Sequence, residues 1–222
     1  MAKPSAAPVA LTAVVLLLLA MTSSSLAAII TVRNQCPIWI SVCQESLRRP
    51  ATCFALSPRT GARSMNVGRV WESAIISGFR GNNANVQQGI QAKPQANLAE
   101  FTLGLNNMDK YDLSNVNAYN LPLMINPTFT NGGVRRGLHW GSPRFYIPFL
   151  DSFCKPPNRH TGPPGKGCIN VVGPTTPRPT PSKAFKRACP SSYSYTLDDR
   201  NANPGVMYGC NVGSNYEVDF CP

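Results

Sequence analysis

The stretch QANLAEFTLGLNNMDKYDLSN (residues 95–115) places one carboxylate, Glu100, inside an otherwise neutral, strand-like run, and a second acid, Asp112, beyond a loop. Two strands that flank a loop centred near Asn106 bring positions 100 and 112 face to face, with Cβ atoms about 5 Å apart. Carboxylates at that spacing push their pKa values apart, which is a usual preparation for acid–base chemistry. The alternative is that both acids are solvated on an outer strand face, because strands commonly alternate polar and apolar positions.

Short strand-like runs separated by turn residues continue through most of the chain. Because the chain contains 17 Gly and 21 Pro, long helices are not expected. The runs include AIITVRN (28–34), IWISVC (38–43), SMNVGRVW (64–71), LAEFTLGL (98–105), SYSYTLD (192–198) and YEVDF (216–220). β-Branched and aromatic runs at this spacing predict a mainly β protein, built as an antiparallel sandwich or barrel.

Residues 131–183 differ in composition from the rest of the chain. The runs CKPPNRHTGPPGKGC (154–168) and GPTTPRPTPSK (173–183) are rich in proline, which removes backbone donors and fixes φ. We expect an irregular loop lobe here, with the Pro/Thr run as an extended linker. The sandwich core is then expected at about 28–130 and 184–222.

The N-terminus has the layout of a secretory signal peptide. A basic residue, Lys3, precedes the apolar run VALTAVVLLLLAM and the small residues of SSSLAA. Residues 1–27 are expected to be removed by cleavage between Ala27 and Ala28. No later segment is long and apolar enough to predict a membrane span, so we expect a soluble, monomeric mature chain in the extracellular space (the apoplast). The vacuole is not expected, because no extension beyond FCP is present that would direct the chain there.

Cysteine usage and charge narrow the classes of partner. All eight cysteines follow the predicted signal, and an even number in an exported chain predicts disulfides. No C-x-x-C pair occurs and the histidines are His139 and His160, so neither a zinc site nor any cofactor is expected. The net charge of +11 favours acidic polysaccharides, anionic membranes or microbial walls as partners. Nucleic acid is not expected, because the basic residues are dispersed.

Six segments, in this order along the chain, resemble the thaumatin-like family of secreted plant defence proteins. They are ITVRNQCPIWISV (30–42), GRVW (68–71), LAEFTL (98–103), YDLSNVNAYNLPLMINPT (111–128), FKRACPSSYSYTLDD (185–199) and VGSNYEVDFCP (212–222). The resemblance implies a β-sandwich, a disulfide-stapled loop lobe and an acidic cleft between them. The family usually has sixteen cysteines, and its cysteine-bearing hairpins between Trp71 and Leu98 are missing here, which implies a reduced lobe.

The resemblance also implies which residues line the cleft. The family's cleft arginine falls on Arg69, its glutamate on Glu100 and its first aspartate on Asp112. Asn117 stands where the second aspartate is expected. The third aspartate falls on Asp198, with Asp199 as a near substitute.

One disulfide follows from the resemblance and three further pairings are proposed. In the family the first and last cysteines pair, which here gives Cys36–Cys221. Cys189 and Cys210 match family cysteines whose usual partners are missing, so we expect them to pair with each other. The remaining cysteines then form Cys43–Cys53 and Cys154–Cys168, which close local loops.

Three functions are compatible with these residues. The first is antifungal binding of a wall polysaccharide such as β-1,3-glucan, in which the amide of Asn117 bonds sugar hydroxyls. Aromatic platforms for stacked sugars would come from Trp71, Tyr111, Tyr119 and Trp140.

The second function is weak endo-β-1,3-glucanase activity. A glycosidase needs at least two carboxylates, and Glu100 and Asp112 could supply them. Glu100 would be the general acid, Asp112 the base or nucleophile, and Arg69 would hold one of them ionised. The third function is inhibition of a foreign secreted glycosidase such as a xylanase, through His139 or the Pro-rich loop between Cys154 and Cys168.

Overall fold

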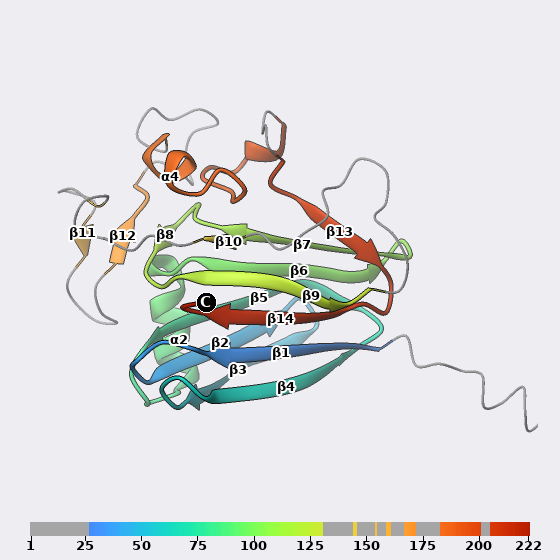
Figure 1. The fold of residues 1–222 in the computed structure, drawn as a ribbon, viewed down its shortest axis with the longest axis horizontal. Helices are drawn as coiled ribbons and strands as arrows, with labels where there is room; N and C mark the ends of the chain where they lie inside the picture. Colours follow the sequence, from blue (N-terminus) through green and yellow to red (C-terminus); the bar gives the residue numbers. More distant parts are fainter. Residues whose placement is uncertain are drawn as a thin grey trace, which may run out of the picture.

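The computed structural model describes residues 27–130, 144–145, 154, 159–160, 167–171, 183–200 and 205–222. Two sheets lie face to face and form the body of the molecule (Figure 1). The first contains, in spatial order, β10 (Arg144–Phe145), β9 (Leu123–Phe129), β14 (Asn215–Phe220), β1 (Ala28–Asn34) and β4 (Gly61–Gly68). The second contains β13 (Tyr208–Asn211), β7 (Met108–Ser114), β6 (Leu98–Leu105), β5 (Trp71–Arg80), β2 (Ile40–Ser46) and β3 (Arg49–Leu56). The predicted mainly β sandwich is therefore confirmed.

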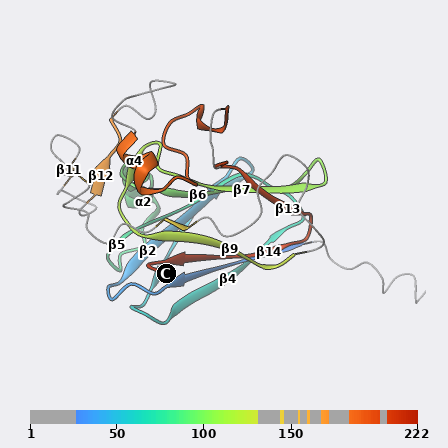
Figure 2. The ribbon, with the colours of Figure 1, turned by 45° about the horizontal axis from the view of Figure 1, so that its top comes forward.

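Smaller elements lie outside the two main sheets. Strands β11 (Arg159–His160), β12 (Gly167–Ile169) and β8 (Ala118–Tyr119) form a short sheet. The helical elements are α2 (Val86–Ala92), η1 (Lys93–Gln95), α4 (Lys183–Ala188) and η2 (Asp198–Arg200). Figure 2 shows α4 and the chain that follows it on the side of β7 away from β14. None of the described helices is long and apolar enough to cross a membrane.

The core fills the space between the two main sheets. Alternate residues of β1 point into it, so that Ile30 and Val32 are fully buried while Ile29 is exposed. The second sheet contributes aromatic rings, and Phe101 lies 5.8 Å from Trp71 and 5.6 Å from Tyr216 of the first sheet, centroid to centroid. Such contacts between rings from both sheets fix how the sheets pack.

Several predicted strands need correction. AIITVRN and LAEFTLGL coincide with β1 and β6, but SMNVGRVW is divided between β4 and β5 at Gly68, whose φ is +76°. SYSYTLD is not a strand, because Asp198 Oδ2 accepts bonds from Ser194 N at 2.8 Å and Ser194 Oγ at 3.0 Å and so holds the run in turns. The first sheet also contains one parallel pair, β1 with β14.

The structure contains three of the four proposed disulfides: Cys36–Cys221, Cys43–Cys53 and Cys154–Cys168. The proposed Cys189–Cys210 bond is wrong, because these two buried cysteines are not joined. Cys189 acts electrostatically on Tyr208 and Cys210 on Tyr111, and these two rings stack at 5.7 Å. Both thiols thus lie near this stacked pair of tyrosines.

Helix α2 packs on the outer face of the second sheet, over the Cys43–Cys53 bond. Asn85 caps its first turn by accepting from Gln87 N at 2.8 Å. Gly89 permits the close approach, because a Cβ there would lie 2.1 Å from Cys43 Sγ. This outer face also carries the predicted acidic pair.

The predicted domain limits stay predictions. Strand β1 begins at Ala28, the residue that the predicted cleavage would leave at the N-terminus, while residues 1–26 lie outside the described part of the chain. Most of the predicted loop lobe (131–183) also lies outside it, as do His139 and Trp140.

Candidate ligand-binding groove

Glu100 and Asp112 are direct cross-strand partners on β6 and β7, so the prediction that these positions face each other is confirmed. The turn is a two-residue loop, Asn106–Asn107, with φ values of 53° and 56°, as a type I′ hairpin requires. Counted from this loop alone, Glu100 would face position 113. A bulge in β6 near Gly104 shifts the register by one residue and restores the pairing with Asp112.

Gly104 is held in the bulge by contacts on both sides. Its φ is +71°, and a Cβ would lie 1.9 Å from the carbonyl oxygen of Arg69. Its N–H donates to Asp109 Oδ1 at 2.8 Å, while Tyr216 Oη donates to Asp109 Oδ2 at 3.0 Å. The register of the acidic pair therefore depends on a glycine and a buried aspartate outside the pair itself.

Two hollows of about 360 Å³ each meet at the acidic pair, and we call them together the acidic groove. Glu100, Asp112 and Met207 line both hollows. Ser73, Thr102 and Lys110 line the first, which we call the Ser73 hollow. Asn117, Tyr193 and Thr196 line the second, the Asn117 hollow. The groove thus offers two neighbouring spaces with polar walls and a carboxyl pair between them.

Burial raises the pKa of both carboxyls. Asp112 is 7% exposed, and desolvation is the main cause of the rise in its pKa, followed by the charge of Glu100. Desolvation also raises the pKa of Glu100, while interactions with the side chains of Asp112 and Ser114 and the charge of Lys93 lower it. Burial therefore favours the protonated form of both carboxyls.

Asp112 is the more deeply enclosed carboxyl, while Glu100, which the sequence proposed as the general acid, is only partly buried. Lys93, which pairs with Glu45, lowers the pKa of Glu100. Whether either group is catalytic stays a prediction.

The structure separates the two predicted C-terminal acids. Asp198 is 2% exposed and forms a salt bridge with Lys186 at 2.7 Å, so it fastens the segment after α4 and lines neither hollow. Asp199 is exposed, and its charge helps to raise the pKa of Asp112. Asp199, the near substitute, is therefore the one of the two acids whose charge acts on Asp112, while the charges of both act on Tyr193.

Tyr193 connects that segment to the wall of the groove. Its N–H donates to Leu113 O at 2.8 Å, and its carbonyl accepts from Asn115 N at 2.8 Å, so the segment runs beside the end of β7. Burial, followed by the charges of Asp112 and Asp199, raises the pKa of its hydroxyl, which stays neutral. It is therefore a hydrogen-bonding group beside the acidic pair.

Other predicted site residues have different positions from those expected. Arg69 is exposed at the turn between β4 and β5 and lines neither hollow, because its backbone packs against Gly104 at the far end of β6. Asn117 does line the groove, and its carbonyl accepts from Asn170 N at 2.8 Å. Among the expected stacking platforms, Trp71, Tyr111 and Tyr119 are core residues with no more than 2% exposure.

Sequence reasoning missed several residues of the groove. Thr102 and Lys110 form the next cross-strand pair on the face of Glu100 and Asp112, so strand alternation alone would have found them. Ser73 reaches the groove through a bulge in β5, where its φ is 47° and its N–H donates to Thr102 Oγ1 at 3.2 Å. No sequence signal marks Tyr193 or Met207, which arrive from distant segments.

The described residues contain no group of three or more His, Cys, Asp or Glu side chains that could hold a metal ion. The chemistry of the acidic groove accordingly rests on its carboxyl pair, hydroxyls, amides and Lys110.

A model of the thaumatin family matches residues 34–222. Thaumatin-like protein 1 of Arabidopsis thaliana is 30% identical over 230 aligned positions, which cover 88% of this chain and 86% of the relative. Pathogenesis-related thaumatin-like protein 3.2 of Cryptomeria japonica is 29% identical, and the alignment covers 88% of each chain.

Two solved structures are distantly similar, each with 12% identity. The thaumatin-like xylanase inhibitor TLXI aligns with a TM-score of 0.42 over 87% of this chain and 99% of its own. The protein elicitor MoHrip2 from Magnaporthe oryzae aligns with a TM-score of 0.44 over 88% and 100%. At these scores the two likenesses carry no argument about this chain.

Proposed function

Because this chain belongs to the thaumatin family, we propose that it is a secreted defence protein whose acidic groove binds β-1,3-glucan of microbial walls without cleaving it. The disulfides and the pathogenesis-related relative support secretion and a defence role. The basic net charge of the chain favours retention at anionic microbial surfaces, with antifungal consequences.

The burial of Asp112 is the observation that favours binding over hydrolysis. A glycosidase needs two carboxyls that both reach the sugar, one as the acid and one as the nucleophile or base. Asp112 is only 7% exposed, while its cross-strand partner Glu100 is partly buried. One accessible carboxyl suits hydrogen bonding to sugar hydroxyls better than the two-carboxyl chemistry of hydrolysis.

The polar groups along the groove suit a neutral sugar chain. Ser73 and Thr102 supply hydroxyls in one hollow, and Asn117 supplies an amide in the other. Glu100 and Asp112, which line both hollows, add carboxyl oxygens that can bond sugar hydroxyls. The end-to-end arrangement of the hollows favours an extended polymer over a single compact ligand.

Sedimentation with insoluble β-1,3-glucan tests this proposal. We expect the protein to sediment with the glucan and to release no reducing sugar. Thr102→Ala and Asn117→Ala should each weaken binding about threefold to tenfold, because each removes hydrogen bonds worth about 0.5–1.5 kcal/mol. The matched control is Thr31→Ala on β1, whose hydroxyl bonds Ser64 Oγ at 2.9 Å on the other sheet.

Two results would overturn the proposal. Absence of sedimentation would mean that the groove does not bind this glucan. If the wild type releases reducing sugar and Glu100→Gln does not, the protein hydrolyses the glucan instead. Inhibition of a foreign glycosidase stays a prediction, because His139 and most of the loop from 154 to 168 lie outside the described residues.

A further inference from the structure

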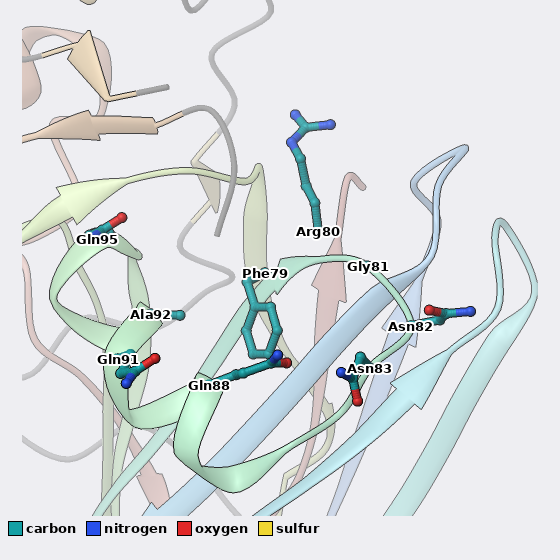
Figure 3. A pocket seen from close by; sticks show the side chains of 9 residues that line it. All are labelled: Phe79, Arg80, Gly81, Asn82, Asn83, Gln88, Gln91, Ala92 and Gln95. Carbon is teal, nitrogen blue, oxygen red and sulfur yellow. The ribbon is translucent and has the colours of Figure 1, made fainter. Parts of the chain in front are cut away.

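A second pocket of about 630 Å³ lies between α2–η1 and the loop that follows β5 (Figure 3). Five amide side chains line it: Asn82, Asn83, Gln88, Gln91 and Gln95. Phe79 and Ala92, which are both buried, form its apolar floor. Its volume lies within the range of roughly 300–1,000 Å³ that is common for small-molecule sites.

This pocket is distinct from the acidic groove, with which it shares no lining residue. It is built by residues 79–95, in the part of the chain where the expected cysteine-bearing hairpins of the family are missing. Helix α2, turn η1 and the loop after β5 therefore create a concave surface that the acidic groove does not use.

The walls of the pocket are held by packing beneath them. Ala92 and Phe79 form a buried cluster with Cys43, and the disulfide of that cysteine lies directly under Gly89. The N–H of Gly81 donates to Trp39 O at 2.9 Å, which fixes the start of the loop. A site whose backbone is already ordered loses less entropy when a ligand binds.

The lining chemistry selects a neutral ligand rich in hydroxyls. Each amide carries both a donor and an acceptor, which is the pairing that a sugar hydroxyl needs, and an apolar floor suits the C–H face of a sugar ring. Gln95 Oε1 is buried and has no hydrogen-bond partner within the described part of the chain. This oxygen could therefore accept a hydrogen bond from a ligand. The charged member of the lining, Arg80, extends away from α2 in Figure 3.

We propose that this pocket is a second, independent carbohydrate site that binds a short neutral oligosaccharide through the amides of α2 and of the preceding loop. Its volume of about 630 Å³ limits the ligand to a few sugar rings. The proposal does not require the acidic groove to bind glucan, and either site can fail without the other.

Side-chain amide NMR signals test the proposal directly on the mature protein. The probes are neutral trisaccharides of β-1,3-linked glucose and of N-acetylglucosamine, with a trigalacturonate as the anionic comparison. We expect saturable shifts of the Asn82, Asn83, Gln88 and Gln91 amide signals with at least one neutral trisaccharide. The double variant Gln88→Leu/Gln91→Leu should weaken that binding about tenfold or more, because two hydrogen-bonding amides are lost.

Two controls separate this site from its surroundings. Gln87→Leu changes an exposed glutamine of the same helix that lies outside the pocket lining, and it should leave the affinity unchanged. Asp112→Asn alters the acidic groove and should also leave it unchanged. The proposal is overturned if neither neutral trisaccharide shifts the amide signals, or if Gln87→Leu weakens binding as much as the double variant. The proposal of a neutral ligand is also overturned if trigalacturonate binds more tightly than the neutral trisaccharides and Arg80→Gln abolishes that binding.

Discussion

Replacing Glu100 by glutamine is expected to lower the pKa of Asp112, because the change removes a carboxylate in contact with it while preserving its shape. Two unit charges about 4 Å apart interact by about 1 kcal/mol in water and about 4 kcal/mol at an effective dielectric constant of 20. The repulsion between the two carboxylates is therefore on the order of 1–4 kcal/mol, and its removal should lower the pKa of Asp112. It should still remain above the ordinary value of 3.8, because burial is the larger cause of the rise and is unchanged.

Carboxyl ¹³C NMR titration of the wild type and of Glu100→Gln measures this shift. The control is Glu217→Gln, which removes a carboxylate from β14 on the other sheet. An unchanged Asp112 midpoint, or an equal shift in the control, would refute the coupling of the pair.

The same coupling has a consequence for stability. A carboxyl whose pKa is raised on folding stabilises the native state at low pH, and this contribution is lost as pH rises through the folded pKa. The wild type should therefore gain stability as pH falls from the folded pKa of Asp112 towards 3.8. In Glu100→Gln this window should be narrower, because the folded pKa is lower.

Gly104→Ala should lower the free energy of unfolding in urea by about 1–3 kcal/mol, because its Cβ would meet the Arg69 carbonyl at 1.9 Å in a backbone of positive φ; a variant as stable as the wild type would contradict the bulge. Thiol labelling should find no reactive cysteine in the folded protein and two, Cys189 and Cys210, in the denatured unreduced protein; finding none after denaturation would mean that they pair. Burial raises the pKa of Asp109 to about 6, so stability should increase as pH falls from about 6 to 3.8. Asp109→Asn should lose that increase in unfolding experiments across this range, and parallel pH profiles of wild type and variant would contradict it.

Local sequence determined the strands and the hairpin that carry the acidic pair. The alternation in AIITVRN predicts β1 because one face of a strand must be apolar to enter a core. Two adjacent asparagines between strand-like runs favour a tight turn, because asparagine tolerates the left-handed φ values observed at Asn106 and Asn107. The facing of Glu100 and Asp112 was predicted for an incomplete reason, since it also needs the one-residue bulge near Gly104.

Only the tertiary structure decided which polar residues belong to the acidic groove. Asp198 and Asp199 are neighbours in sequence, yet one is locked by Lys186 and Ser194 while the charge of the other reaches Asp112. Arg69 precedes β5 but packs at the far end of β6, which strand patterning does not reveal.

Burial was likewise decided by contacts between segments that are distant in the chain. Trp71 and Tyr111 were candidate sugar platforms, but both are buried in the core, where Trp71 stacks on Phe101 and Tyr111 packs against Tyr216 of the first sheet. The sequence by itself determined the strands, the turn and the presence of two acids, because these depend on neighbours a few residues away. The raised pKa values of Glu100 and Asp112 depend on desolvation by residues from several segments, and only the folded chain brings those residues together.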